Sequence, residues 1–395
     1  MSIQAVALRA PESRTRRAAG GFSFEIADGV GSFEAAWRML EERATATPYQ
    51  RFDWVRSFVE AGVDGIADTR ILLVRDDGGR PVMLLPLTVT RLAGLAVASI
   101  VGGKHANFQL PLTCRATAAR MSVGEQRRLL LDAGRSLGLD AFDFQLLPRS
   151  WDGAAVAMAA WGRPSPSNAY GVAIAGDGDA AVKRAMSTEG RRKLRNKENN
   201  LRKLGAVEFL IARTEEQVDL ILGAFLQQKS DRFRDQGIRD PFAGAAASFL
   251  RAASLRGLSE GRPGIELSAL TLDGRVIAAF GAAADARRIS GMFISFDPEF
   301  GRYSPGDQLV AKVIADSADR GRAVFDLGVG EAEYKHRFCR EPEELVDVLL
   351  PITARGRAYI AARQAAIGIK RRIKQSEGAM RVVRGLRRLR ARLGL

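Results

Sequence analysis

Hydrophobic residues in the first half of the chain alternate with polar ones in short runs, which is the period of β-strands. The segment ILLVRDDGGRPVMLLPLTV places two such runs around Asp77-Gly78-Gly79, and this arrangement predicts a β-hairpin. Apolar residues then recur at helical spacing before AFDFQLL alternates again. The predicted order is a hairpin over 71–89, a strand over 95–101, the loop GGKHANFQLPL, a helix over 123–137 and a strand over 141–147.

The second half repeats this order. IELSALTLDGRVIAAFGAA carries a two-residue Asp273-Gly274 turn between apolar runs. A strand over 289–296, the loop DPEFGRYSPG, a helix over 307–320 and the strand VFDLG follow. The copies lie about 180 to 195 residues apart and share their order without residue identity. The pattern predicts a duplicated α/β (α+β) unit of mixed sheets flanked by helices.

Further elements surround the two copies. Ser32 is the predicted N-cap of a helix through Trp37, and Pro48 separates that helix from a second one around Trp54. In the second half the pattern predicts a strand over 170–174, a basic helix within 183–205, a strand over 206–211 and a helix that runs from a Thr214/Gln217 capping box through Phe225.

The positive charge of the chain is confined to its ends. The 395 residues include 60 Lys+Arg and 45 Asp+Glu, a formal charge of +15. Residues 354–395 hold 13 Lys or Arg and one acid, and the first 20 residues hold four arginines and one acid. Residues 21–353 are therefore neutral as a whole. The charge argues for tethering at an anionic surface through the ends, and not for nucleic acid as the main partner.

Composition excludes several classes of protein. A hydrophobic content of 46% excludes collagen-like and disordered chains, and two cysteines without CxxC spacing exclude a disulfide framework and argue against a metal site. We expect a cytoplasmic protein, because no signal peptide is visible and Pro86 and Arg91 interrupt the most hydrophobic window, 83–100.

The strongest local signal for chemistry lies between residues 293 and 338. A strand breaks at Asp297-Pro298, and a Gly/Ser/Pro loop then leads to a helix N-terminus. Backbone N–H groups at Ser304 and Gly306, together with the positive helix end, would suit an anion such as a pyrophosphate. The alternative is structural, because Ser304 followed by Pro305 is also an ordinary helix start.

This segment resembles the acetyltransferase family associated with bacterial cellulose biosynthesis (the CelD/BcsL-like group), whose domain is related to the GNAT and FemAB folds. The basic stretch RRKLRNKENNLRKLG and the element TPYQRFDW support the resemblance, which covers most of residues 30–350. The motifs that carry it are Tyr303-Ser304-Pro305-Gly306 with Leu309, Phe325-Asp326-Leu327-Gly328-x-Gly330, and Tyr334-Lys335 with Phe338.

The resemblance implies tandem GNAT-like sheets. We expect a basic disordered arm over 1–21, an N-terminal GNAT-like half over 22–168, a C-terminal GNAT-like acetyltransferase half over 169–353 and a basic amphipathic helical tail over 354–395. It also implies that the pantetheine of an acyl-CoA donor lies against a splayed strand at 289–296, with the pyrophosphate at the following helix. The donor-binding residues implied are Phe293, Ile294, Tyr303, Ser304, Gly306 and Asp307.

The chain departs from the GNAT pattern in its phosphate loop. The usual Arg/Gln-x-x-Gly-x-Gly/Ala is absent, and only Gly301 and Gly306 flank the turn. Since FemAB-type relatives use aminoacyl-tRNA, the donor could be acetyl-CoA, another acyl-CoA or aminoacyl-tRNA.

Acyl transfer needs a base, donors for the carbonyl oxygen and an acid for the leaving thiolate. We expect Asp326 to act as the base or to position the acceptor, Tyr334 to be the acid and Lys335 to hold an anionic group. A structural alternative stands beside each role: Asp326 as a cap of the next turn, and Tyr334 with Phe338 as core residues.

The acceptor side is predicted from polar residues in two regions. His105 and Asn107 occupy, in the first repeat, the place that the GRYSPG loop holds in the second, while Lys229 and Arg232 precede a turn-rich stretch. A loop histidine that is merely solvated is the alternative. The basic segment 183–205 is either a solvated helix face or a wall that faces phosphates.

We therefore expect an acyltransferase that moves an acyl group from acyl-CoA to an amine or hydroxyl of a cell-envelope or exopolysaccharide acceptor, without a metal. Residues 367–395 have the composition of a helix lying on an anionic membrane, and a solvated basic tail is the alternative. Two alternative functions stay open. One is a FemAB-like transferase that uses aminoacyl-tRNA, which is the alternative that requires a nucleic-acid partner. The other is a non-catalytic scaffold of a polysaccharide synthase.

Overall fold

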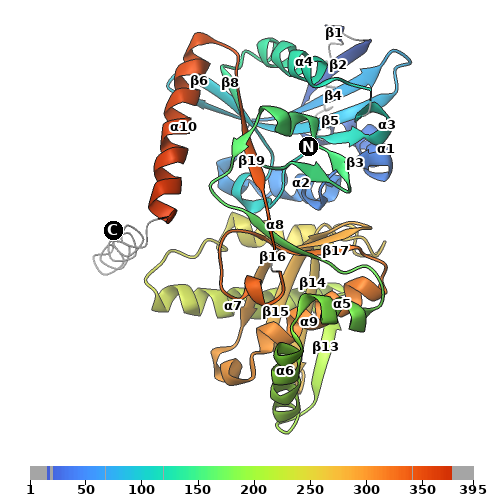
Figure 1. Cartoon of the computed structure of the whole chain (residues 1–395), viewed down its shortest axis with the longest axis vertical. Coiled ribbons are helices and arrows are strands. Elements are labelled where there is room, and N and C mark those ends of the chain that lie inside the picture. The colour runs from blue at the N-terminus through green and yellow to red at the C-terminus, as the bar shows by residue number, and fades with distance from the viewer. Residues whose placement is uncertain (1–15, 18–20, 67, 119, 340, 376–395) are drawn as a thin grey trace, which may run out of the picture.

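Two β-sheets, one built mainly from each half of the chain, lie one above the other in the molecule (Figure 1). The computed structural model describes residues 16–17, 21–66, 68–118, 120–339 and 341–375. Within these residues the first sheet has the order β1-β2-β4-β5-β6-β8-β19-β11, with β3 and β7 attached beside β5. Its strands are β1 (Arg16–Arg17), β2 (Phe22–Asp28), β3 (Ala44–Thr45), β4 (Thr69–Asp76), β5 (Pro81–Leu92), β6 (Leu95–Ile100), β7 (Leu112–Cys114), β8 (Ala141–Pro148), β11 (Arg163–Pro164) and β19 (Leu345–Pro351).

The second sheet has the order β13-β14-β15-β16-β17-β12-β18 in the described part of the chain. The turn between β14 and β15 is Asp273-Gly274, with φ of +49° and +81°, as a type I′ hairpin requires. Its strands are β12 (Ala169–Ala173), β13 (Val207–Ile211), β14 (Glu266–Leu272), β15 (Arg275–Ala284), β16 (Arg288–Phe296), β17 (Val324–Val329) and β18 (Glu341–Glu343).

Helices cover both faces of both sheets, so the predicted α/β class is confirmed. Each predicted helix is present, and Ser122 and Glu125 form a full capping box at the start of α4. The helices are α1 (Glu34–Arg43), α2 (Phe52–Glu60), α3 (Arg115–Ala118), α4 (Val123–Ser136), α5 (Gly178–Ala185), α6 (Thr188–Leu201), α7 (Glu215–Asp235), α8 (Ala245–Leu255), α9 (Pro305–Asp319) and α10 (Ala354–Gln375).

The duplicated unit is visible in the pairing of the strands. In the first half a hairpin, β4–β5, continues into β6, a loop and α4, and the next strand, β8, pairs parallel with β6. In the second half β14–β15 continues into β16, a loop and α9, and β17 pairs parallel with β16. In each half the connection between the two parallel strands contains a long helix, α4 or α9, because parallel neighbours need a crossover to return the chain.

The core between the sheets belongs to both halves. Side chains of β4 alternate between two buried clusters, with Ile71 and Leu73 facing the middle of the molecule. There they share one cluster with α1, α2, α7, α8 and the inner face of the second sheet. Trp54 on α2 lies edge to face with Phe249 on α8, with ring centroids 5.1 Å apart. This contact joins residues that are almost 200 positions apart.

Some details differ from the expected organisation. Leu345–Pro351, placed by the sequence in the second half, pairs with β8 in the first sheet. Its residues are buried on both faces, so its apolar pattern alone does not distinguish between the two sheets. Arg16–Arg17, within the expected disordered arm, pair with β2. Ser32 does not cap α1: its hydroxyl donates to Asp28 O, and Phe33 is the N-cap residue. The basic segment 183–205 spans the end of α5 as well as α6.

The helical tail is described only in part. α10 begins at the predicted place and packs its first turns on the first sheet, where Tyr359 and Arg363 both contact Asp143. The apolar positions that define the expected membrane-binding face lie mostly in 376–395, outside the described residues. Among the helices in the described ranges, none is long and apolar enough to cross a membrane.

Candidate functional site

The parallel strands β16 and β17 pair only at their beginnings and then separate. Their partners are Arg288 with Val324, Ile289 with Phe325, and Ser290 with Asp326. On the other side of β16, Gly291 and Phe293 face consecutive residues of β15, so Met292 is an extra residue in a β-bulge. The separation leaves a small gap of about 30 Å³, which we call the strand gap. Its lining comes from β15, β16, β17 and the following loop: Phe280, Gly291, Met292, Phe293, Ile294, Leu327 and Tyr334.

A side chain from the first half bridges the two strands where their ladder stops. The Asn107 amide nitrogen donates to Gly291 O on β16 at 2.9 Å, and its oxygen accepts from the Val329 N–H on β17 at 3.1 Å. Gly328 has φ of +71°, and a Cβ there would lie 2.3 Å from the Asn107 amide nitrogen. Only glycine therefore allows this close approach.

Behind this bridge lies a chain of buried hydroxyl and carboxylate groups. Asn107 donates to the Tyr49 hydroxyl at 2.6 Å, and the Tyr49 and Ser290 hydroxyls are 2.7 Å apart. Ser290 donates to Asp326 Oδ1 at 2.6 Å. Tyr49, Ser290 and Asp326 are all fully buried. We call Asn107, Tyr49, Ser290 and Asp326, together with Arg288, the interface network.

Arg288 joins the network to the aromatic residues of the first half. Its guanidinium lies 3.3 Å from Asp326 and 3.4 Å from Glu343, and its carbon is 3.9 Å from the centre of the Trp151 ring. Burial raises the pKa of Asp326 to about 6, although Arg288 and the Ser290 hydrogen bond act in the opposite direction. Asp326 contributes no atom to the lining of the strand gap. Its carboxylate faces the interface network.

Tyr334 and Lys335 are neighbours with different surroundings. Tyr334 lines the strand gap, and burial raises the pKa of its hydroxyl. The Lys335 ammonium is buried and donates to the carbonyls of Gly328 and Val329, each at 3.0 Å. Burial lowers the pKa of Lys335 to about 8. Lys335 thus fixes the end of β17, next to the position of Tyr334.

The predicted anion site at the start of α9 is built around Ser304. This residue has φ of +52°, and its hydroxyl accepts a hydrogen bond from Lys197 at 2.7 Å in place of capping the helix. The first-turn N–H groups of Gly306 and Asp307 precede the helical ladder. Asp307 forms an ion pair with Arg337, and the Arg302 guanidinium lies 4.7 Å from the Tyr303 ring.

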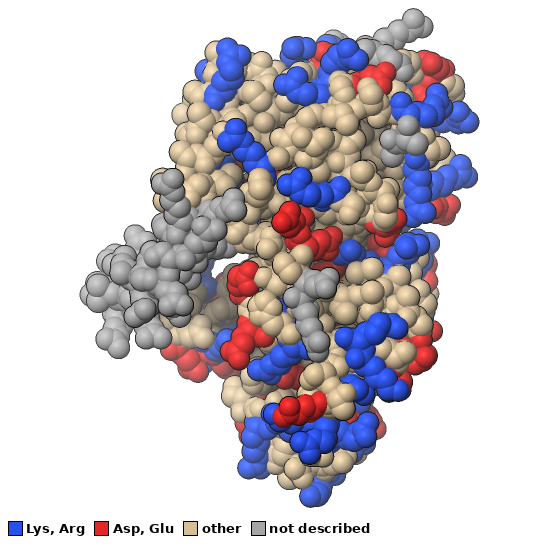
Figure 2. Space-filling view, in the orientation of Figure 1, with Lys and Arg blue, Asp and Glu red and all other residues tan. Residues whose placement is uncertain are grey.

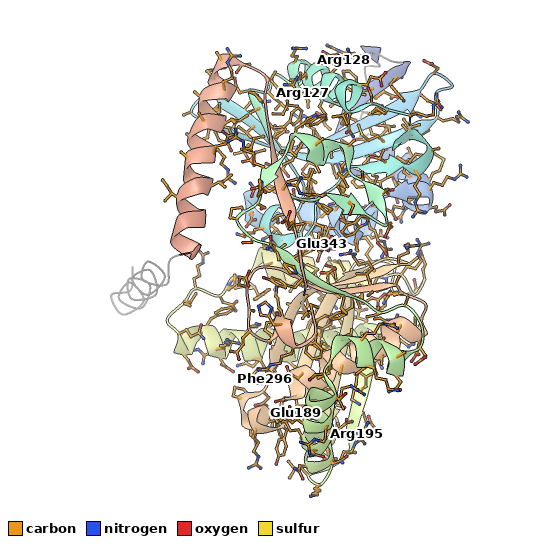
Figure 3. All side chains as sticks on the ribbon, viewed as in Figure 1. Arg127, Arg128, Glu189, Arg195, Phe296 and Glu343 are labelled. Carbon is orange, nitrogen blue, oxygen red and sulfur yellow. The ribbon has the colours of Figure 1, made fainter. Side chains whose placement is uncertain are left out.

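The basic helix α6 borders this site. α6 packs on the segment before α9, and Lys312 of α9 contacts Glu198 of α6 at 3.0 Å. Figure 3 labels Glu189 and Arg195 on α6 and Phe296 at the nearby end of β16. Lys and Arg side chains gather on the end of the molecule that α6 forms (Figure 2). The basic segment therefore has both a solvated face and a contact with the predicted anion site.

The expected acceptor residues are not brought together. Asn107 contacts the backbone of Gly291, which lines the strand gap, whereas His105 lies against Phe58 and 3.2 Å from Asp64, and burial lowers the pKa of His105. Lys229 lies on α7 with its ammonium 6.0 Å from the centre of the Phe225 ring, which packs on Phe293, and burial lowers the pKa of Lys229 to about 8. Arg232 is exposed on the same helix. His105 and Asn107 were predicted together because they lie in the same loop, but their side chains have different surroundings.

Four residues of the site were missed at the sequence level: Tyr49, Arg288, Ser290 and, as an individual residue, Lys197. Tyr49 lies in the TPYQRFDW element that supports the resemblance, which was a usable signal. The contacts of Ser290 and Arg288 depend on packing between the halves. No periodicity in the sequence reports such packing.

Comparisons with known proteins agree with this description. Residues 188–336, less than half of the chain, match the family described as Acetyltransferase (GNAT) domain. No curated protein matches the chain. Among solved structures, FemX is similar over 84% of this chain and 98% of its own, with 10% identity and a TM-score of 0.58.

Two further structures have the same fold. A C-terminal domain from Agrobacterium fabrum, provisionally named lysylphosphatidylglycerol synthetase, matches 86% of this chain and 96% of its own at 12% identity and a TM-score of 0.52. A protein of unknown function from Bacteroides thetaiotaomicron matches 82% and 97% at 11% identity and a TM-score of 0.51. At such identities the similarity shows the fold alone.

Proposed function

We propose that this chain is an acyltransferase that moves an acyl group from acyl-CoA to an amine or hydroxyl. The observation that carries the proposal is the strand gap, an opening between parallel strands with the Tyr334 side chain on its wall. The GNAT match over residues 188–336 supports it, because the matched segment contains β16, α9 and β17.

The donor would lie along β16. Beyond Gly291, whose carbonyl accepts from Asn107, that strand pairs with no residue of β17, so its backbone groups there could bind the amides of a pantetheine arm. Phe293 and Ile294 line the gap beside it. The pyrophosphate would then meet the first turn of α9 and the cations Lys197 and Arg302. These contacts support the donor residues implied by the sequence, from Tyr303 to Asp307.

The reaction breaks the thioester C–S bond and forms a C–N or C–O bond, while a proton moves from the acceptor to the leaving thiolate. Tyr334 would supply this proton, because its side chain lines the strand gap and a phenolic hydroxyl is protonated at neutral pH. Lys335 would hold the end of β17 through its carbonyl contacts. Asp326 would position β17 through Ser290 and Arg288, since its carboxylate does not face the gap.

For the acceptor we keep a cell-envelope or exopolysaccharide compound at a cytoplasmic membrane face, supported by the sequence resemblance and the basic tail alone. Lys229 is the candidate acceptor-side cation, because it lies by the Phe225 ring, which packs on Phe293 of the strand gap. The scaffold alternative keeps this fold without donor binding. The tRNA alternative is favoured by the basic surface of α6 and predicts binding that weakens steeply with salt.

Calorimetric titration with acetyl-CoA and CoA tests the proposal, followed by an assay of CoA release with a panel of amines. We expect Lys197→Ala to weaken acetyl-CoA binding about tenfold, the cost of one charge-assisted contact. Lys203→Ala is the matched control, because Lys203 is exposed and contacts Asn200 only at the helix end. Absence of binding to either ligand would refute the acyl-CoA reaction, and salt-sensitive tRNA binding in its place would favour the alternative.

A further inference from the structure

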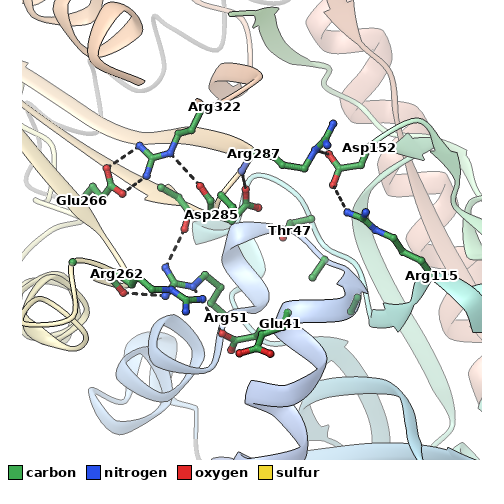
Figure 4. Close-up of a pocket in the computed structure, with 16 residues that line it drawn as sticks. Glu41, Thr47, Arg51, Arg115, Asp152, Arg262, Glu266, Asp285, Arg287 and Arg322 are labelled. Atoms are coloured by element: carbon green, nitrogen blue, oxygen red, sulfur yellow. Dashed lines mark hydrogen bonds and ion pairs between the residues drawn. The ribbon is translucent and has the colours of Figure 1, made fainter. Parts of the chain in front are cut away.

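A second and larger cavity lies between the halves, just before the start of β16, whereas the strand gap lies beside the middle of that strand. It encloses about 420 Å³, and we call it the interdomain pocket. One wall comes from the end of α1, the segment up to Arg51, Arg115 and Asp152; the other comes from 261–266, 284–287 and Arg322 (Figure 4). It shares no lining residue with the strand gap. A ligand here would contact both halves of the molecule at once.

Several charged groups of the pocket are held by the wall itself. Arg322 and Glu266 form a two-pronged ion pair, which Arg320 joins at 2.9 Å. Arg51 donates to three backbone carbonyls, those of Arg262, Pro263 and Ala284. These groups fix the shape of the pocket, and their charges and donors are already engaged.

One side of the pocket has an excess of positive charge. Arg115 and Arg287 flank a single carboxylate, Asp152, at 3.6 and 3.3 Å. Both arginine side chains are more than half exposed, so each keeps donors directed to solvent or to a ligand. Figure 4 shows the three side chains together, apart from Arg51 and Glu41. Two guanidinium groups beside one acid suit a ligand carboxylate.

Two other carboxylates of the lining, Glu41 and Asp285, are incompletely compensated. Glu41 is 9% exposed; its Oε1 accepts the Phe52 N–H, and its Oε2 lies 4.0 Å from a nitrogen of Arg51. Asp285 accepts the N–H groups of Arg287 and Arg288 through one oxygen, Oδ1. Burial raises the pKa of both carboxylates. A cationic group beside either carboxylate would stabilise its ionised form.

We propose that the interdomain pocket binds a small zwitterion, an α-amino acid or a short peptide, with its carboxylate at Arg115 and Arg287 and its ammonium group at Glu41 and Asp285. The lining carries five acids and five arginines, so a neutral ligand with separated charges fits better than a polyanion or a polycation. The volume is in the range of small-molecule sites. This inference goes beyond the proposed acyl transfer, because the ligand site and the strand gap are separate.

The test is calorimetric titration and thermal unfolding of the full chain with L-alanine, L-glutamate, L-lysine and alanylalanine. Propionate and ethylamine serve as probes that carry one charge each. We expect at least one zwitterion to bind and to raise the unfolding temperature, and both single-charge probes to bind at least about tenfold more weakly. Arg287→Gln and Asp285→Asn should each weaken that binding by a similar factor.

The variants are chosen so that the fold survives. Arg287 is exposed, and an asparagine at 285 keeps the oxygen that accepts two N–H groups. Arg135→Gln, an exposed arginine on α4, is the matched control and should bind as the wild type does. Acetyl-CoA affinity should be unchanged in Arg287→Gln, which separates this site from the donor site. No binding of any zwitterion at about 10 mM, or equal affinity in Arg287→Gln, would overturn the proposal.

Discussion

The ionisation of Asp326 is set by the packing of the two halves. The carboxylate is fully buried between Ser290, Arg288 and the Gly328 N–H. Desolvation disfavours its charged form more than these contacts favour it, so its pKa rises. The sequence suggests Asp326 as a base, but in the structure it belongs to the interface network beside β16 and β17. Its protonation is therefore coupled to the free energy of unfolding.

This titration predicts a pH-dependent stability. Between its ordinary pKa of 3.8 and the raised value of about 6, the folded state holds a proton that the unfolded state releases. The free energy of unfolding should therefore fall through this window as pH rises. Asp326→Asn removes the titration, so its stability should fall less from about pH 4 to pH 6, as measured by urea unfolding. Asp132→Asn, which changes an exposed carboxylate, should show the same pH dependence as the wild type. If the stability of Asp326→Asn also falls with pH as much as that of the wild type, the raised pKa of Asp326 is contradicted.

Tyr334 allows a sharper test of chemistry, because Tyr334→Phe removes only a hydroxyl and keeps the ring in the wall of the strand gap. If this hydroxyl protonates the leaving thiolate, kcat for CoA release should fall about 100-fold while KM for acetyl-CoA stays similar. Stability should change by less than about 0.5 kcal/mol. Tyr359→Phe, whose hydroxyl contacts Asp143 in the first sheet, should keep the wild-type rate. Equal kcat in the two variants would remove Tyr334 from the reaction.

Strands β16 and β17 depend on a residue outside their own sheet. Three residue pairs hold them together, and beyond these pairs the Asn107 side chain takes the place of the ladder. The first half thereby sets the width of the strand gap in the second half. The glycine at 328 is required for the same contact.

Removing this bridge should destabilise the protein. Asn107→Ala leaves Gly291 O and the Val329 N–H without their partner, and we expect a loss of about 2 to 4 kcal/mol in the free energy of unfolding. Denaturant unfolding measures this loss. Asn200→Ala, an exposed position on α6, should change stability by less than about 0.5 kcal/mol. If Asn107→Ala loses no more stability than this control, the arrangement of β16 and β17 does not depend on the Asn107 side chain.

These elements also show what the sequence can predict. The hairpins, β16 and α9 were predicted, because alternation, an Asp-Gly turn and a Pro at a helix start are local signals. The sheet of Leu345–Pro351 and the contact of Arg288 with the Trp151 ring were not, because both depend on residues more than 100 positions away. Tyr334 was proposed from a motif and Asn107 from the repeat, and their roles stay predictions. Only the structure shows that Tyr334 lines the strand gap and that Asn107 contacts Gly291 O.

The two halves form one body through a shared core and an exchanged strand. α2 of the first half packs on α8 of the second, with Trp54 and Phe58 both against Phe249. β19, which follows the second sheet in the chain, completes the first. Neither half can therefore lose its structure without exposing apolar surface of the other.

We expect the protein to unfold in a single transition, and the distribution of its tryptophans makes this testable. All four, Trp37, Trp54, Trp151 and Trp161, lie before residue 169, so tryptophan fluorescence reports on the first half while far-UV circular dichroism reports on both. The two unfolding curves should coincide. Phe249→Ala, a cavity in the second half, should shift both curves equally, by about 3 to 5 kcal/mol. If the circular dichroism curve shifts and the fluorescence curve does not, the halves unfold separately. A cavity in the second half can shift the unfolding of the first half only if the two share a core.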